Sequence, residues 1–188
     1  MKLIRTDIPD VVIIEPAVFK DERGSFTESY NDARFRAALA EAGLPTPRPF
    51  VQDNQSVSSK GVLRGMHFQA APHAQGKLVR VVKGAVFDVA VDARPESPTF
   101  GLWVGAELSA ENHRQLWIPE GFAHGFLALK DDTHFLYKTT DYYNKDAERA
   151  VVWNDPAVGI RWPLDGAPVL GAKDAAVTTT LRQAVAAD

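Results

Sequence analysis

The sequence predicts an all-β fold, a sandwich or barrel, with one short helix near its N-terminal end. From residue 50 onward, short apolar runs recur between turn signals, a spacing that is typical of sandwiches and barrels. Only the stretch Asn31 to Ala42 has a clear helical pattern. No internal repeat or low-complexity tract interrupts this organisation. A chain of 188 residues suits a single core, so we expect one domain spanning residues 1–188.

Composition excludes several classes of function. The net charge of -3 is too small to indicate a nucleic-acid or membrane partner, although a local cluster of basic side chains can still bind phosphate. The chain has no cysteine, so it has no disulfide, thiolate metal site or cysteine nucleophile. Asp7, Pro9 and Asp10 interrupt any signal-peptide core, and no apolar run approaches the roughly 20 residues of a membrane span. We therefore expect a cytoplasmic protein.

The first thirty residues predict short strands. The apolar runs Val11 to Ile14 and Val18-Phe19 are flanked by Pro9 and Pro16, which suits edge strands better than central ones. Such an N-terminal strand often pairs with another subunit. A turn signal, Asp-Glu-Arg-Gly, then precedes a short strand over Ser25 to Tyr30.

The helix predicted over Asn31 to Ala42 has recognisable ends. Asn31 can cap its N-terminus, Gly43 closes it, and Phe35, Leu39 and Ala42 fall on one face. The proline-rich connector that follows cannot continue the helix. Because ordered patterning resumes directly after it, we interpret it as a stiff connector and not as a domain boundary.

The remaining strands follow in close succession, and Lys83-Gly84 predicts a hairpin between the first two of them. The predicted strands are Leu78 to Val82, Ala85 to Asp92, Phe100 to Leu108, Arg114 to Ile118, Gly125 to Leu129 and Thr133 to Tyr142. The tail after Val151 is irregular, with a short helix expected near Ala175 to Val185. The pattern favours the jelly-roll barrel of the cupins, with one N-terminal and one short C-terminal helix.

Polar side chains are concentrated in the stretch Gly61 to Lys77, which we interpret as one wall of an active site. His67 could be a general base, a metal ligand or a core residue. A cupin metal site requires a second histidine two positions later and then a glutamate. Here Gln69 occupies that position, and no glutamate lies between Met66 and Glu96. We therefore expect no metal and no cofactor.

Other residues could carry chemistry or be structural. His73 follows a proline in a predicted loop and is expected at the surface. Lys77 begins a strand; it could point inward to stabilise an oxyanion or extend its amine into solvent. Tyr137 shares one face of an alternating strand with Phe135, where it could pack or act as an acid.

The evidence for the remaining candidates is weaker. A functional role and a capping role are equally compatible with the position of His124 at a glycine-flanked turn. Asp174 looks like half of a charged pair with Lys173 unless it reaches a histidine. Groups able to recognise a base edge and a phosphate occur at Arg23, Glu28, Gln52, Asp53 and Asn54.

Eight segments in order along the chain carry a family resemblance. They are Phe19 to Gly24, Phe50 to Asn54, Gly61 to Gln69, Gln75 to Val81, Trp117 to Phe126, Tyr137 to Tyr143, Trp153 to Pro156 and Leu170 to Asp174. With these segments the sequence resembles the dTDP-4-dehydrorhamnose 3,5-epimerases, metal-independent cupin enzymes of the dTDP-L-rhamnose pathway. Met66 and Ser25 depart from the family pattern, where bulkier apolar or aromatic residues are common, but neither departure removes a chemical group.

The resemblance implies roles for specific residues. His67 corresponds to the catalytic base, Asp174 to its partner, Tyr137 to the acid on the opposite face, and Lys77 to the group that stabilises the enolate oxygen. The other positions that match the family's substrate-binding residues are Phe19, Arg23, Phe26, Glu28, Gln52, Asp53, Asn54, Arg64, His124, Glu148 and Lys173. Of these, Phe19 and Phe26 are expected to stack on or wall the thymine. The expected partner is a dTDP-4-keto-6-deoxy sugar, and the expected assembly is a homodimer.

Three other functions fit parts of the pattern. A related epimerase could invert only C3 or only C5, because the same base and acid serve both reactions. A non-catalytic sugar-nucleotide-binding cupin would not need both a base and an acid. A metal-dependent cupin oxygenase or isomerase would lose activity in a chelator.

Overall fold

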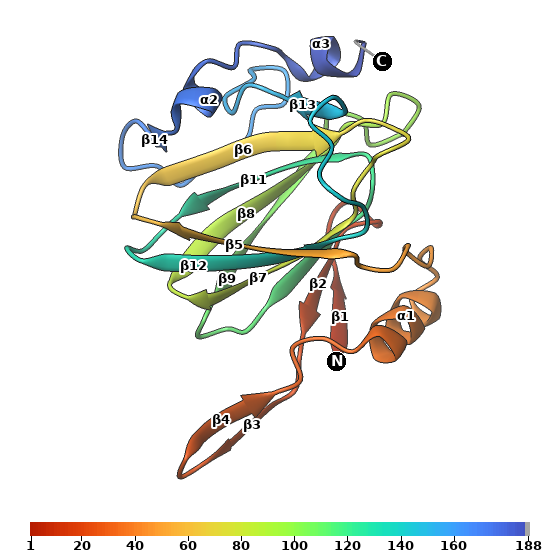
Figure 1. Cartoon of the computed structure of the whole chain (residues 1–188), viewed down its shortest axis with the longest axis vertical. Coiled ribbons are helices and arrows are strands. Elements are labelled where there is room, and N and C mark those ends of the chain that lie inside the picture. The colour runs from red at the N-terminus through yellow and green to blue at the C-terminus, as the bar shows by residue number, and fades with distance from the viewer. Residues whose placement is uncertain (187–188) are drawn as a thin grey trace.

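The computed structural model describes residues 1–186, in which two mainly antiparallel six-stranded sheets pack face to face (Figure 1). The first sheet has the strand order β1 (Lys2–Arg5), β2 (Val12–Glu15), β10 (Gln115–Ile118), β7 (Lys77–Lys83), β12 (Thr133–Thr139) and β5 (Gln52–Ser58). The second has the order β13 (Glu148–Ala150), β6 (Val62–Gln69), β11 (Phe122–Ala128), β8 (Ala85–Asp92) and β9 (Trp103–Ser109), with β14 (Val169–Leu170) parallel to β6. This is the all-β architecture that the strand spacing predicts. No helix within residues 1–186 is long and apolar enough to cross a membrane.

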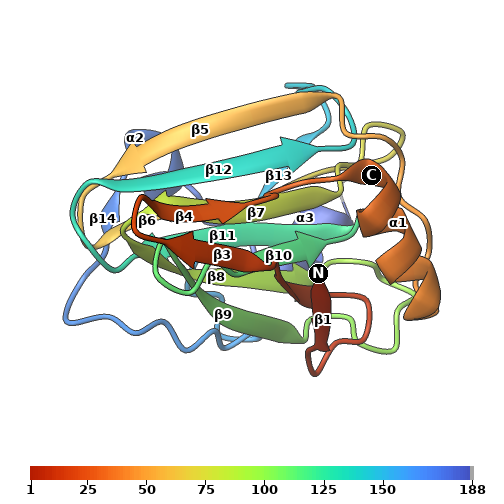
Figure 2. The ribbon, with the colours of Figure 1, turned by 90° about the horizontal axis from the view of Figure 1, so that it is seen from below.

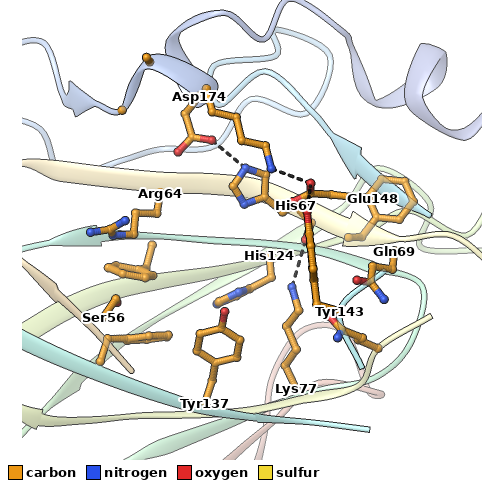
Figure 3. A pocket seen from close by; sticks show the side chains of 17 residues that line it. Ser56, Arg64, His67, Gln69, Lys77, His124, Tyr137, Tyr143, Glu148 and Asp174 are labelled. Carbon is orange, nitrogen blue, oxygen red and sulfur yellow. Dashed lines mark hydrogen bonds and ion pairs between the residues drawn. The ribbon is translucent and has the colours of Figure 1, made fainter. Parts of the chain in front are cut away.

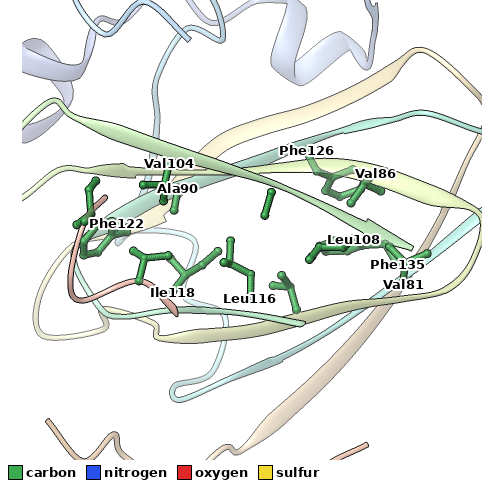
Figure 4. Packing of buried hydrophobic residues seen from close by; sticks show 14 residues of the cluster. Val81, Val86, Ala90, Val104, Leu108, Leu116, Ile118, Phe122, Phe126 and Phe135 are labelled. Carbon is green, nitrogen blue, oxygen red and sulfur yellow. The ribbon is translucent and has the colours of Figure 1, made fainter. Parts of the chain in front are cut away.

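The main core fills the space between the two sheets (Figure 4). Its members are buried aliphatic and aromatic side chains, including Val79, Val81, Val86, Ala90, Leu108, Leu116, Phe122, Phe126 and Phe135. Phe126 and Phe135 come from opposite sheets, and their rings stack with centroids 4.2 Å apart. This contact closes the core at the end where polar side chains begin.

A second cluster covers the outer face of the β6, β11, β8 and β9 sheet. The irregular chain after Val151 lies on this face, and Leu181 of α3 (Leu181–Val185) packs with Val89 and Val91 of β8. Strand β8 is therefore buried on both faces, and its interior face carries the buried Asp88 between the core residues Val86 and Ala90. The single C-terminal helix predicted near Ala175 to Val185 is confirmed only in its second half, because a separate short helix, α2 (Ala172–Ala175), ends before it.

The predicted hairpin at Lys83-Gly84 is wrong. Strands β7 and β8 on either side of it lie in different sheets, β7 beside β10 and β12, and β8 beside β11 and β9. Gly84 turns the chain from one sheet to the other with a φ of 79°, and a Cβ atom there would lie 2.3 Å from Thr133 Oγ1. Only glycine fits this crossing.

The predicted helix is confirmed as α1 (Asp32–Glu41). The Asn31 side chain accepts a hydrogen bond from the backbone N–H of Arg34, as a capping asparagine should. Phe35 and Leu39 are fully buried against the first sheet, in a cluster with Trp117. The helix thus covers the outer face of that sheet.

Between β2 and α1, strands β3 (Val18–Asp21) and β4 (Gly24–Thr27) form a separate two-stranded hairpin. It projects away from both sheets, and the view from below shows it lying beneath them (Figures 1 and 2). The strand predicted to reach Tyr30 ends at Thr27. Phe19 and Phe26 face each other across the hairpin and are 65% and 70% exposed, which is unusual for two phenylalanines on one short element.

Candidate active site

A pocket of about 430 Å³ opens between the two sheets beyond the main core (Figure 3). Strands β5, β6, β7, β11, β12 and β13 and helix α2 supply its walls. Its lining residues are Ser56, Arg64, His67, Phe68, Gln69, Gln75, Lys77, His124, Phe126, Phe135, Tyr137, Tyr143, Glu148, Gly171, Ala172, Lys173 and Asp174. The stretch Gly61 to Lys77 thus contributes to this wall, as its polar composition predicts.

His67 and Asp174 form a hydrogen-bonded pair at one side of the pocket. His67 lies near the end of β6, and α2 brings Asp174 to it from 107 residues further along the chain. The distance between His67 Nε2 and Asp174 Oδ1 is 2.7 Å. Although burial alone would raise the pKa of Asp174, its hydrogen bond with His67 holds that pKa below the usual value. Asp174 is therefore an acceptor and Nε2 carries the proton; in the neutral imidazole, Nδ1 then has a lone pair able to accept another.

Lys77 is buried beneath His67. The side chain at the start of β7 points into the barrel, and its Nζ donates to the backbone oxygen of His67 over 3.2 Å. Burial lowers the pKa of Lys77 to about 8, while the negative charges of Asp88 and Glu148 favour its charged form. Of the two orientations that the sequence allows, the inward one is confirmed. The pocket therefore holds a cation with little competing solvent.

His124 pairs with the carboxylate of Asp88, a residue that was not predicted to belong to the site. On neighbouring strands β11 and β8, His124 Nε2 lies 3.0 Å and 3.2 Å from the two oxygens of Asp88. Burial lowers the pKa of His124 and raises the pKa of Asp88. A neutral imidazole whose Nε2 proton is held by Asp88 presents Nδ1 as an acceptor. His124 is therefore biased toward its neutral form, in which Nδ1 can accept a hydrogen bond from a ligand.

Tyr137 comes from the opposite sheet to His67 and lies across the pocket from it (Figure 3). Its ring packs against Phe135, so the two share one face of β12 as predicted. Burial raises the pKa of Tyr137, so its hydroxyl stays protonated near neutral pH. The pocket thus has a proton acceptor at one side and a proton donor at the other.

Charged side chains line the outer part of the pocket. Lys173 donates to Glu148 over 2.6 Å, and the Tyr143 hydroxyl donates to the same carboxylate over 3.0 Å. Arg64 donates to the Ser58 hydroxyl over 3.1 Å and still lines the pocket. An anionic ligand could approach these two basic side chains from solvent.

Eight of the predicted site residues lie in this pocket, and the others do not. Gln52, Asp53 and Asn54 lie on edge strand β5 beside the pocket, where Asp53 pairs with Lys138 and Gln52 bonds to Asn54. Phe19, Arg23, Phe26 and Glu28 lie on or next to the projecting hairpin, where Arg23 pairs with Asp21 and Glu28 with Arg34. None of these seven residues lines the pocket of its own chain, and their role in ligand binding stays a prediction.

Several aromatic or polar residues that line the pocket, Tyr143 and Ser56 among them, were not predicted as site residues. Tyr143 lies at the end of a segment that carries the family resemblance, yet nothing in its local pattern separates it from the adjacent Tyr142. Ser56 lines the pocket from β5, and its buried hydroxyl has no hydrogen-bond partner among residues 1–186. The position of each depends on how distant parts of the chain meet, which local patterning does not encode.

Within residues 1–186, no group of three or more histidine, cysteine, aspartate or glutamate side chains is arranged to hold a metal ion. The position two residues after His67, which a metal-binding cupin would use, holds the amide of Gln69. That amide is fully engaged with backbone groups. Absence of a metal requirement stays a prediction that a chelator can test.

The fold and the pocket together define a cupin-type barrel whose site is arranged for acid and base chemistry on two faces of a ligand. The family model for dTDP-4-dehydrorhamnose 3,5-epimerase matches residues 5–182. The chain belongs to this family of isomerases, and the resemblance drawn from its motifs is confirmed.

Relatives of known identity match over nearly the whole chain. The dTDP-4-dehydrorhamnose 3,5-epimerase of Salmonella typhimurium is 59% identical over 176 residues, which cover 94% of this chain and 93% of the relative. The crystal structure of a Legionella pneumophila dTDP-6-deoxy-D-glucose-3,5-epimerase in complex with dTDP-4-keto-L-rhamnose has 50% identity and a TM-score of 0.89, covering 96% and 93% of the two chains. A 3'-monoepimerase from Streptomyces bikiniensis, solved with dTDP-quinovose, has 34% identity and a TM-score of 0.86, covering 96% and 88%.

Proposed function

We propose that this protein converts dTDP-4-dehydro-6-deoxy-D-glucose to dTDP-4-dehydro-L-rhamnose by inverting C3 and C5 of the sugar. The observation that carries the proposal is the placement of the His67 and Asp174 pair across the pocket from Tyr137, with the buried amine of Lys77 between the two sheets. Identity of 59% to a relative of that activity supports the choice of substrate.

The C4 ketone makes the first chemical step accessible. Removal of a proton from C3 or C5 leaves a carbanion that is delocalised onto the C4 oxygen as an enolate. Nδ1 of His67 takes this proton, and Asp174 stabilises the imidazolium that forms. The positive charge of Lys77 stabilises the enolate oxygen, because a fixed charge in a desolvated site acts strongly where negative charge develops.

Tyr137 completes the inversion. Its hydroxyl donates a proton to the carbon from the face opposite to His67, and the enolate electrons return to form the new C–H bond. Solvent then returns a proton to Tyr137 and takes one from His67. The same pair serves the second carbon after the sugar turns in the pocket, so one base and one acid suffice for both centres.

Turnover of the proposed substrate tests the proposal. The protein is treated with EDTA, desalted and mixed with dTDP-4-dehydro-6-deoxy-D-glucose, and the sugar is followed by proton NMR. We expect the signals of dTDP-4-dehydro-L-rhamnose to appear at a rate that EDTA does not change. Unchanged substrate at enzyme concentrations that bind dTDP would instead support a non-catalytic sugar-nucleotide-binding cupin, and loss of activity in EDTA would support a metal-dependent one.

Inversion at a single carbon is the second candidate. A 3'-monoepimerase with 34% identity has the same fold, with a TM-score of 0.86. This similarity supports single-carbon inversion, because it shows that the fold is compatible with that reaction. His67, Tyr137 and Lys77 would serve that reaction unchanged. Measuring which carbons exchange their protons separates the two functions.

The charge of Lys77 predicts a pH dependence. With a pKa of about 8, Lys77 is charged below that pH and neutral above it, so activity should fall as the pH rises through about 8. The measurement is kcat/KM between pH 6 and 10. The variant Lys77→Arg stays charged throughout this range, and we expect it to be less active but to lack this alkaline decline. An unchanged decline in Lys77→Arg would assign the titration to another group.

We further propose that the protein acts as a homodimer in which the β3–β4 hairpin of one subunit serves the pocket of its partner. The hairpin projects away from the two sheets of its own subunit (Figure 1), and its two facing phenylalanines are exposed. It also carries Arg23, a basic side chain suited to phosphate, at its turn. The four predicted substrate-binding residues on or next to the hairpin would thus contact a substrate that is bound in the pocket of the partner subunit.

Mixing two inactive variants tests this arrangement. The variant His67→Asn lacks the base, and the double variant Phe26→Ala with Arg23→Ala lacks the hairpin groups. After co-expression, half of the randomly formed dimers are mixed, and each mixed dimer has one complete site, so we expect about a quarter of the wild-type activity. Activity no greater than the sum of the separate variants, or a monomer in light scattering, would contradict the proposal.

A further inference from the structure

The side chain of Gln69 binds three backbone groups on two loops at the rim of the pocket. Gln69 is the last residue of β6 and is 5% exposed. Its Nε2 donates to the backbone oxygens of His73, over 2.6 Å, and Tyr142, over 3.2 Å. Its Oε1 accepts from the backbone N–H of Asn144 over 2.9 Å. Both protons and the oxygen of the amide are therefore used.

Two other glutamines hold the same short segment, residues 141–144, which we call the rim segment. Gln75 Nε2 donates to the backbone oxygen of Asp141 over 2.8 Å. The Oε1 atom of Gln52 accepts from the backbone N–H of Tyr143 over 3.1 Å. Each of the four consecutive residues thus has a backbone group bonded to a glutamine side chain. Gln69 alone binds the rim segment on both sides of Tyr143.

The rim segment carries Tyr143 into the pocket, where Figure 3 shows it at the same side as Gln69. The Tyr143 hydroxyl donates to Glu148, which also accepts from Lys173. Glu148 lies directly opposite Gln69 in the pairing of β13 with β6. The orientation of this aromatic and charged part of the pocket therefore depends on a loop whose backbone is fixed by side chains and not by a strand ladder.

We propose that Gln69 is a positioning residue that fixes the rim segment and so pre-forms the part of the pocket lined by Tyr143, Glu148 and Lys173. The basic side chain of Lys173 makes this part suited to the diphosphate of the proposed substrate. Only a side chain with two donors and an acceptor in one plane can make these bonds. Glutamate would place an oxygen against two carbonyl oxygens, and leucine would remove the side-chain partner of all three part-buried backbone groups. The choice of dTDP as the probe rests on the proposed function.

The variants Gln69→Glu and Gln69→Leu test this role, with Gln55→Leu as the matched control. Gln55 is exposed on β5 and bonds only to the side chain of His134 at the surface. For each protein, the measurements are the hydrogen exchange rate of the Asn144 amide by NMR, the Kd for dTDP by calorimetry, and kcat and KM. Because Gln69→Glu keeps the size of the side chain, it remains informative if Gln69→Leu fails to fold.

We expect exchange at Asn144 to accelerate at least about 10-fold and the Kd for dTDP and the KM to rise about 10-fold in Gln69→Glu, the size expected when part-buried hydrogen bonds are lost. Exchange in β8 and kcat should stay within about 3-fold of wild type, because His67 and Lys77 are held by strands. Unchanged Asn144 exchange and dTDP affinity would overturn the inference, as would a loss of kcat with unchanged KM. Failure of the wild type to bind dTDP would instead contradict the proposed function, while the exchange result would still judge the role of Gln69.

Discussion

Replacement of His67 by asparagine is expected to abolish proton exchange at the sugar. Asparagine can keep a hydrogen bond to Asp174 but has no lone pair basic enough to remove a carbon-bound proton. General base catalysis is typically worth about 10²–10⁴-fold, so we expect kcat to fall by at least that factor. The measurement is the rate of deuterium incorporation from D₂O, followed by NMR.

Binding provides the control for this variant. Because the outer part of the pocket is unchanged, the Kd for dTDP should remain within about 3-fold of wild type, as for a residue that acts in the chemical step. The matched variant His73→Asn changes a half-exposed histidine near Asp141, and it should retain wild-type exchange. Persistent exchange in His67→Asn would show that the base is another residue.

Replacement of Tyr137 by phenylalanine is expected to separate exchange from inversion. The base and the enolate-stabilising amine remain, so a proton can still leave the carbon, but no acid is left on the opposite face. We expect inversion to slow about 10²–10⁴-fold, the usual range for a missing general acid. Deuterium should still enter at the original face, giving labelled substrate with retained configuration.

The hydroxyl of Tyr137 is the only group that this substitution removes, since the ring continues to pack against Phe135. A matched control is Tyr142→Phe, which alters a surface tyrosine that is 64% exposed. Inversion at the wild-type rate in Tyr137→Phe would contradict the assignment of the acid. Equal loss of exchange and inversion would show that Tyr137 is needed before the proton leaves.

The parts of the fold that could be predicted are those with local causes. The helix α1 follows from the capping residue Asn31 and from the spacing of Phe35 and Leu39, and it is found where predicted. Strand β8 has the predicted limits, Ala85–Asp92. The pairing of strands has no such local cause. Lys83-Gly84 looks like a hairpin turn, but the burial of β8 between the main core and the C-terminal tail places it in the second sheet.

The site shows the same division. The shared face of Phe135 and Tyr137 follows from strand alternation, and the structure bears it out. For Lys77 the sequence leaves the inward and the solvent-facing orientation open, and the structure shows the inward one. The partner of His67 lies 107 residues away, so no spacing rule could find it. Asp88 is a comparable case. In the sequence it is a polar interruption of an apolar strand, and only the pairing of β8 with β11 reveals that it holds His124.

The most direct test of the central claim is to follow deuterium incorporation during turnover in D₂O. Proton abstraction at both carbons with reprotonation from the opposite face predicts that dTDP-4-dehydro-6-deoxy-D-glucose yields a product labelled at both C3 and C5, with both centres inverted. The label is read from the loss of the two proton signals by NMR. Label and inversion at only one carbon would contradict double epimerisation and assign the protein to the single-centre epimerases.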